Sequence, residues 1–334
     1  MLLKEIGEFG FIDRISEKFK GFSIRNAVGI GDDCAVLPIN HKYANVVTTD
    51  MLVENVHFIR SKITPFELGY KTLAVNLSDV AAMGAKPIAS FLSIAIPPSI
   101  DVEYLDKFFE GYNSLCKKYD VSLLGGDTTR SENNLILNVT VIGRIYQNKA
   151  RLRCMAKSGD IICVTGYLGD SAGGLKVLLE NIPLSENEEY LIKCHNIPEP
   201  CVNEGIWLAN QKGVNAMIDI SDGIVSDLKH ILKASKKSAI VDIQKIPISK
   251  QLKIVANNNH FNIIEFATSG GEDYQLLFTI NEKDFTKISN KFFNKFKKEL
   301  YSIGKIEDET NETILWLKDD VPVDDIKEGF NHFI

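Results

Sequence analysis

Acidic side chains recur at short polar stretches between the apolar segments of this sequence. The stretches contain Asp32 with Asp33, Asp50, Asp79, Asp127, Asp219 with Asp222, and Glu272 with Asp273. Taken singly, each is also explained as a solvated turn or a helix N-cap cluster, where Asp and Gly are common. Taken together, carboxylate oxygens without histidine or thiolate partners suit a hard cation such as Mg²⁺. The series therefore predicts several bound Mg²⁺ ions and, because Mg²⁺ usually accompanies phosphates, a phosphorylated ligand.

The charge of the whole chain supports the same chemistry. The 334 residues carry a formal net charge of -6, which argues against nucleic acid as a partner. An acidic protein with few arginines in its motifs cannot neutralise polyphosphate with side chains alone, so metal ions must supply the positive charge. We therefore expect phosphoryl transfer that works by positioning and charge neutralisation.

One helix is expected to position part of this chemistry, and it runs between Thr64 and Pro87. Thr64 can cap the first free N–H groups, Pro65 suits the first turn, and Glu67 completes a capping box. Gly84 and Pro87 are expected to end it. The positions expected to face the core are Phe66, Tyr70, Leu73, Leu77, Ala81 and Gly84.

A polar stripe on the same helix is more informative. Thr72, Asn76 and Asp79 stand at i, i+4 and i+7, so a helix places them in one line. Asp79 has no lysine or arginine within one turn, and burying an unpaired carboxylate costs several kcal/mol, on the order of the desolvation penalty of an ion. Asp79 must therefore be solvated, protonated, paired from elsewhere in the chain or bound to a metal ion.

The chain is long enough for two domains, and its 45% hydrophobic residues are typical of a globular protein. Strands and helices alternate up to about residue 148, which indicates an α/β or α+β domain with acidic glycine turns at strand ends. We place the boundary near Lys149, which gives domains of residues 1–148 and 149–334. Arg151 and Arg153 stand at this junction, where they are expected to clamp a ligand or to be solvated.

Other features exclude competing interpretations. The segment VTGYLGDSAGGL lacks the lysine that a P-loop requires after its second glycine, which favours a plain helix entry. The N-terminus reads as an amphipathic helix and neither as a signal peptide nor as a membrane span. The six cysteines include no CxxC pair, so we expect reduced thiols in the cytoplasm and no membrane partner.

The motifs together resemble a known family. They are GIGDDCAVL, TTDMLVENVHF, AVNLSDVAAMGAKP, LLGGDTTRS, VTGYLGDSAGGL, IDISDGIVSDL and SGGEDYQLLF. This combination, from about Gly7 to Phe333, is similar to the thiamine-monophosphate kinase family within the aminoimidazole-ribonucleotide synthetase superfamily. The resemblance implies an ATP-dependent enzyme that phosphorylates thiamine monophosphate. It also implies an α/β N-terminal domain, whose sheet pairs with its copy across a homodimer, and an α+β C-terminal domain that completes the cleft.

The resemblance also implies roles for individual residues. The residues implied as Mg²⁺ ligands are Asp32, Thr48, Thr49, Asp50, Asp79, Asp127, Asp219 and Asp222. Those implied to contact ATP are Tyr119, Gly126, Asp127, Arg153 and Ser221. Those implied to hold thiamine monophosphate are His57, Glu272 and the C-terminal aromatic Phe330. The accepting phosphate oxygen is already ionised at neutral pH, so no general base is expected and none is assigned.

Two alternatives remain open at this point. Another ATP-using member of the superfamily is one; selenophosphate synthetase would need a reactive cysteine or selenocysteine beside an N-terminal lysine, which the sequence lacks. A hydrogenase maturation factor would end in a reactive cysteine, whereas this chain ends in NHFI. The other alternative is a catalytically silent dimer that binds nucleotide.

Overall fold

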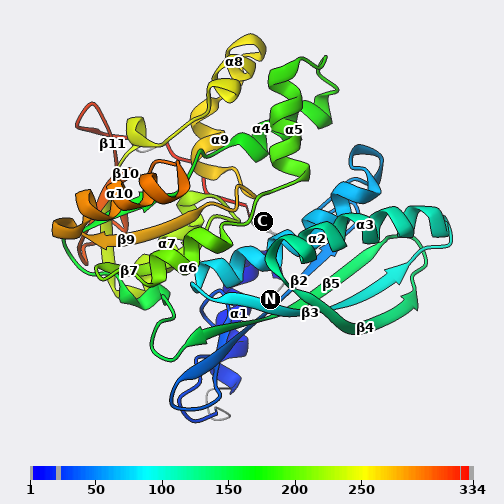
Figure 1. The fold of residues 1–334 in the computed structure, drawn as a ribbon. Coiled ribbons are helices and arrows are strands. Elements are labelled where there is room, and N and C mark those ends of the chain that lie inside the picture. The colour runs from blue at the N-terminus through cyan, green and yellow to red at the C-terminus, as the bar shows by residue number, and fades with distance from the viewer. Residues whose placement is uncertain (1–2, 20–23, 324, 331–334) are drawn as a thin grey trace.

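The computed structural model describes residues 3–19, 24–323 and 325–330, and they form two mixed α/β halves (Figure 1). A five-stranded sheet in the order β1-β2-β5-β3-β4 forms the first half, and a seven-stranded sheet in the order β12-β11-β8-β10-β6-β9-β7 forms the second. The first sheet consists of β1 (Ala35–Pro38), β2 (Tyr43–Val53), β3 (Lys86–Ile96), β4 (Ser122–Arg130) and β5 (Ile136–Tyr146). The same part of the chain contains the helices α1 (Leu3–Phe19), α2 (Pro65–Ala82) and α3 (Val102–Tyr119).

The second half is richer in helices. Its strands are β6 (Asp160–Val164), β7 (Val214–Asp219), β8 (Lys237–Asp242), β9 (Leu276–Asn281), β10 (Tyr301–Asp308), β11 (Ile314–Lys318) and β12 (Val321–Pro322). Its helices are α4 (Asp170–Glu180), α5 (Glu186–Asn196), α6 (Val202–Ala209), α7 (Ile224–Ser235), α8 (Lys250–Asn259), α9 (Ile263–Ser269) and α10 (Glu282–Phe296). Short 3₁₀ turns lie at Arg60–Lys62, Arg153–Met155 and Ile243–Lys245. The predicted mixed fold class is confirmed, whereas the predicted boundary near Lys149 stays a prediction.

Helix α2 is the element that joins the two halves. The expected capping box is present: the Thr64 hydroxyl accepts the Glu67 N–H at 3.3 Å, and the Thr64 N–H donates to the Glu67 carboxylate at 2.8 Å. Helix α6 packs against α2 so closely that a Cβ on Gly205 would lie 2.1 Å from the Ala81 carbonyl oxygen. Only glycine permits this approach, so α2 is held between α3 and α6.

One expected core residue of α2 is exposed. Leu73, Leu77 and Ala81 are buried as expected, but Phe66 is 38% exposed. The backbone carbonyl of Phe66 packs against Gly111 of α3, where an added Cβ would lie 1.8 Å from that oxygen. Because the backbone of this first turn occupies the contact with α3, the Phe66 side chain is left at the surface.

The sequence suggested that the glycine motif before Asp127 ends a strand, and this prediction is wrong. Strand β4 continues to Arg130 and stays parallel to β3, with Asp127 opposite Ser93. A Cβ on Gly126 would lie 1.7 Å from the Leu92 carbonyl oxygen, so glycine lets the two strands approach here. All nine residues of β4 are exposed at the edge of the sheet. An exposed edge of this length is a surface that natural proteins usually cover.

Candidate active site

Three carboxylates from distant parts of the chain meet between the two sheets. Asp33 precedes β1, Asp79 lies in the last turns of α2, and Asp219 ends β7. One carboxylate oxygen from each lies within 4.8 Å of the others. Acids from both halves of the chain therefore converge at this point.

Neighbouring hydroxyl and amide groups orient these acids. The Thr48 hydroxyl donates a hydrogen bond to Asp79, and the Ser78 hydroxyl donates to Asp219 at 2.5 Å. The Asp50 N–H donates to the Asn76 side-chain oxygen at 3.2 Å, which ties β2 to α2. Thr72 differs from the other two residues of the predicted stripe because its hydroxyl bonds back to the Leu68 carbonyl at 2.7 Å. The stripe thus contributes Asn76 and Asp79 to the site.

We call the cluster of Asp32, Asp33, Asp50, Asp79 and Asp219 the acidic end of the site. Its electrostatics favour the binding of added positive charge. Burial, followed by the charge of Asp33, raises the pKa of Asp219 to about 8. The same two causes raise the pKa of Asp32 to about 7 and that of Asp50 to about 6. Burial, then the charges of Asp50 and Asp219, raises the pKa of Asp79 well above its usual value. Buried like charges that raise one another's pKa are relieved when a cation binds among them.

The donor atoms fit a divalent cation. The Asp33 side chain is only 2% exposed, and its Oδ2 atom has no hydrogen-bond partner among the described residues. An unsatisfied buried carboxylate oxygen is costly unless an ion or a proton satisfies it. With Asp79 and Asp219 it offers a set of oxygen ligands of the kind that Mg²⁺ prefers.

Arg153 brings a positive side chain to this acidic end. Its guanidinium contacts Asp33 at 2.7 Å, and its backbone N–H donates to the Asp32 carboxylate at 3.2 Å. Its Nε–H is buried without a hydrogen-bond partner in the described part of the chain. Arg151 is used differently, because it donates to the carbonyls of Ala209 and Gln211 and so fixes the junction between the halves.

The turn after β7 is held in shape by Asp227. Its carboxylate accepts the N–H groups of Ser221 at 3.1 Å and Asp222 at 3.3 Å. Burial, then the charges of Asp222 and Asp219, raises the pKa of Asp227 well above its usual value. The turn therefore presents Ser221 and Asp222 from a buried support, and both line the main cavity.

A cavity of about 720 Å³ extends from the acidic end toward α4 and α5. Lys71 and Glu272 face each other across the halves, with 3.0 Å between the ammonium and the carboxylate. The His57 Nδ1 atom accepts the Val53 N–H at 3.0 Å, which favours the tautomer that carries its proton on Nε2. Phe330 is 50% exposed at the rim, and its N–H donates to the Asp222 carbonyl at 3.0 Å.

The structure brings together many, but not all, of the predicted site residues. Those that line the cavity are Asp50, His57, Asp79, Asp219, Ser221, Asp222, Glu272 and Phe330. Asp32, Thr48 and Arg153 adjoin the acidic end through the hydrogen bonds given above. Gly126 and Asp127 lie instead on the exposed strand β4, and the Thr49 hydroxyl bonds to Asn138 and Thr140 on the sheet surface.

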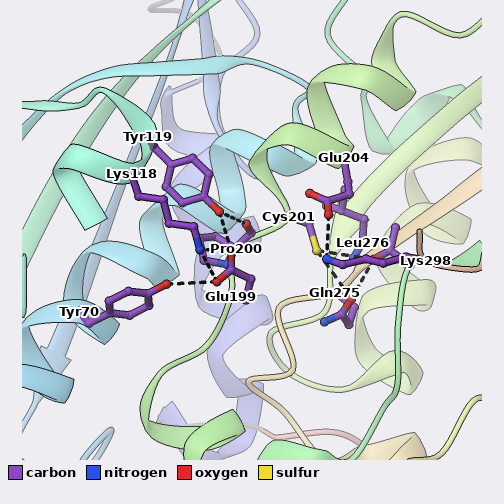
Figure 2. Close-up of polar contacts among 11 residues, drawn as sticks. Tyr70, Lys118, Tyr119, Glu199, Pro200, Cys201, Glu204, Gln275, Leu276 and Lys298 are labelled. Carbon is purple, nitrogen blue, oxygen red and sulfur yellow. Dashed lines mark hydrogen bonds and ion pairs between the residues drawn. The ribbon is translucent and has the colours of Figure 1, made fainter. Parts of the chain in front are cut away.

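Tyr119 also lies apart from the cavity lining. Its hydroxyl donates to the Glu199 carboxylate at 2.8 Å and to the Pro200 carbonyl at 2.9 Å. Figure 2 shows Tyr70, Lys118 and Tyr119 converging on Glu199. This cluster joins α2 and α3 to the segment before α6, and the predicted contact of Tyr119 with ATP stays a prediction.

The start of α4 is occupied by a carboxylate of the chain itself. Asp273 accepts the N–H groups of Gly169 at 2.7 Å and Ser171 at 3.2 Å. The helix N-terminus that could attract a phosphate is thus already capped by a carboxyl group of the chain itself. This agrees with the interpretation of the glycine-rich segment as a helix entry.

Three residues of the site were missed from the sequence. Asp33 was placed in the acidic series but not among the metal ligands, Ser78 was overlooked beside Asp79, and Lys71 was not considered. Asp33 and Ser78 are adjacent in sequence to Asp32 and Asp79, which was a usable signal for both. Nothing local marks Lys71, because its partner Glu272 lies 201 residues away.

None of the described helices combines the length and apolarity needed to cross a membrane.

Comparison with known proteins defines the class first. Residues 31–145 match the family model "AIR synthase related protein, N-terminal domain", and residues 157–317 match the corresponding C-terminal domain. The fold and the site therefore define this chain as an AIR synthase related protein, with two such domains around one acidic cleft.

Individual relatives narrow the class. A thiamine-monophosphate kinase of Buchnera aphidicola is 41% identical over 331 residues, which cover 98% of each chain. The enzyme of the same name from Bacillus subtilis is 37% identical, over 92% of this chain and 93% of the relative. The solved structure of AaThiL complexed with AMPPCP and TMP superposes with a TM-score of 0.86 at 33% identity, covering 100% of this chain and 99% of the other. The chain belongs to the thiamine-monophosphate kinase family, and the predicted family is confirmed.

Proposed function

We propose that this chain transfers the γ-phosphoryl group of ATP to thiamine monophosphate, giving thiamine diphosphate and ADP. The observation that carries the proposal is the acidic end, where Asp33, Asp79 and Asp219 from both halves meet beside a cavity that also contains Glu272. Curated relatives bear the name of this kinase over nearly their full length, and AaThiL binds AMPPCP and TMP together. The enzyme class predicted from the sequence is therefore confirmed.

The chemistry asks little of the protein beyond charge and position. Both reactants are polyanions, and the accepting phosphate oxygen needs no general base. Asp33, Asp79 and Asp219 would hold Mg²⁺, together with the other ligands implied by the resemblance: Asp32, Thr48, Thr49, Asp50, Asp127 and Asp222. When bound, Mg²⁺ supplies positive charge to the phosphate oxygens. Thr48 and Ser78 orient Asp79 and Asp219 for this role.

The binding of ATP is assigned to Tyr119, Gly126, Asp127, Arg153 and Ser221. The contact of Arg153 with Asp33 supports its part in this assignment, because a guanidinium at the acidic end can also receive phosphate oxygens. The buried Nε–H of Arg153 still lacks an acceptor among the described residues, and such a contact would supply one.

We assign the binding of thiamine monophosphate to the part of the cavity away from the acidic end, which is lined by His57, Glu272 and Phe330. The thiazolium ring is a cation, so a carboxylate at its site favours binding. Burial would raise the pKa of Glu272, but the Lys71 ammonium holds it below its usual range. The half-exposed ring of Phe330 at the rim suits an aromatic cover over the substrate.

Assembly and location complete the proposal. The exposed strand β4 favours a homodimer in which the first sheet pairs with its copy. The described cysteines are all free thiols, which is consistent with an enzyme of the cytoplasm.

A direct assay tests the function. Purified protein with ATP and Mg²⁺ is expected to convert thiamine monophosphate to thiamine diphosphate and to leave thiamine, the matched control acceptor, unphosphorylated. Chromatography of the thiamine esters and release of ADP measure the two products. Binding of ATP without either product would instead support the silent nucleotide-binding dimer.

A further inference from the structure

A buried lysine connects the two halves inside the cavity. Lys71 lies on α2, its side chain is only 1% exposed, and its ammonium contacts Oε2 of Glu272 at 3.0 Å. Buried lysines are rare without a partner, because desolvating an ammonium is costly. The helix that carries Lys71 also carries Asp79, so one rigid element reaches both ends of the cavity.

Glu272 is held in an unusual conformation at this contact. Its φ of 63° lies in the left-handed region, which a residue with a side chain adopts at a cost. Its N–H donates to the Ser221 carbonyl at 2.8 Å, which secures that conformation. Side chains held in such conformations cluster at ligand sites, so the geometry points to a role for the direction of this carboxylate.

The two oxygens of Glu272 are used differently. Oε2 receives Lys71 and lies 3.3 Å from Nδ1 of His195. Oε1 accepts no hydrogen bond from any residue in the described ranges, and about 25% of the side chain is exposed. One oxygen is thus anchored while the other is available to a ligand in the cavity that Glu272 lines.

The other charged groups around Glu272 leave Lys71 as the principal anchor. Burial, followed by the charge of Lys71, lowers the pKa of His195 to about 3, so its imidazole is neutral at pH 7. His57 lies on another side, and its charge has a smaller effect on the Glu272 carboxyl than that of Lys71. Asp273 follows in the chain and is turned toward the α4 N-terminus, where it accepts two N–H groups.

We propose that Lys71 is a positioning residue that keeps Glu272 a carboxylate and aims its Oε1 into the cavity, so that the site selects acceptors with a cationic ring. This rests on the proposed function and adds a determinant of specificity to it. Lys71 acts through Glu272 and does not itself touch the reacting phosphates.

The test compares the natural acceptor with a neutral isostere, 3-deazathiamine monophosphate, in which a thiophene replaces the thiazolium. In Lys71→Met at pH 6.5, we expect KM for thiamine monophosphate to rise about tenfold or more, since burial without the Lys71 ammonium favours the protonated form of Glu272. Competitive binding of the neutral isostere, kcat and KM for ATP should change little. The loss should shrink as the pH rises from 6.5 to 8.5, because a higher pH favours the ionised form of Glu272. Lys71→Arg, which keeps the charge, is the matched control and should retain the preference for the cation.

A double variant guards against misfolding. Lys71→Met leaves a buried carboxylate without its cation, whereas Lys71→Met combined with Glu272→Gln removes both charges. If Lys71 acts through Glu272, the double variant should match Glu272→Gln in KM for thiamine monophosphate. A further loss in the double variant, or an equal weakening of both acceptors in Lys71→Met, would overturn the proposal. Absence of turnover in the unaltered protein would instead refute the proposed function.

Discussion

The two ends of the cavity treat buried carboxylates in opposite ways. At the acidic end, burial and neighbouring acids raise the pKa of Asp219 to about 8. At the other end Glu272 is partly buried, yet Lys71 holds its pKa below the usual range. The difference lies in the source of the positive charge. The chain itself supplies a cation, Lys71, to Glu272, whereas at the acidic end it supplies only Arg153 to several carboxylates. Under the proposed function, one end suits a cationic ring, and the other suits metal ions that arrive with phosphates.

The largest expected effect comes from removing one charge at the acidic end. Asp219→Asn should lower kcat by about 10²–10³-fold, as the loss of one transition-state stabilising group does. It should also raise the melting temperature of the metal-free protein, because a buried carboxyl whose pKa is raised to about 8 is replaced by a neutral amide, whose oxygen still accepts from Ser78. Turnover and thermal melting without Mg²⁺ measure the two effects.

Glu272→Gln is the mirror-image control for this prediction. It should lower the melting temperature, since Lys71 would then be buried without a counterion. If both substitutions shifted stability in the same direction, the contrast between the two ends would be wrong.

The next effect concerns pH and Mg²⁺. In the folded protein the pKa values of Asp219 and Asp32, about 8 and about 7, exceed the usual 3.8, so the folded state binds protons that the unfolded state has released. Stability of the metal-free protein should therefore fall as pH rises from about 4 to about 8, by up to about 1.4 kcal/mol per pH unit for each such group. Because Mg²⁺ replaces those protons, it should raise the melting temperature more at pH 8 than at pH 6.

Melting curves at the two pH values with and without Mg²⁺ check this. The contribution of Glu272 has the opposite sign, because its lowered pKa stabilises the fold above its usual pKa and is lost at lower pH. An equal Mg²⁺ effect at both pH values would show that the acidic end is already neutralised in another way.

The smallest effect is expected away from both ends, at Glu199. Tyr119→Phe and Tyr70→Phe each remove one hydroxyl that donates to this carboxylate, and each should cost about 1 kcal/mol of unfolding free energy. Because the Tyr119 hydroxyl is occupied by Glu199 and Pro200, the ATP contact assigned to Tyr119 would be made by its ring, which Tyr119→Phe keeps, so KM for ATP should stay unchanged in both variants. Denaturant unfolding and ATP titration measure these quantities. A rise in KM for ATP in Tyr119→Phe alone would show that the hydroxyl, and not the ring, makes the nucleotide contact.

Local features of this protein were predictable from the sequence. The capping box at Thr64 and Glu67 formed as expected, because both of its hydrogen bonds join residues three apart. The identity of the acidic residues and their preference for oxygen-seeking cations also followed from residue type alone. The strand through Gly126 was harder, because whether a glycine ends a strand depends on the neighbouring β3.

Long-range pairings were decided by the packing of α2 between the two sheets. Ser78 meets Asp219 across 141 residues, and Lys71 meets Glu272 across 201. By itself the sequence determined which groups could ionise and which segments would form helices, since these depend on side-chain chemistry and near neighbours. Only the tertiary structure decided which buried acid receives a cation from the chain and which acids share their charge with one another, because that depends on distances set by packing.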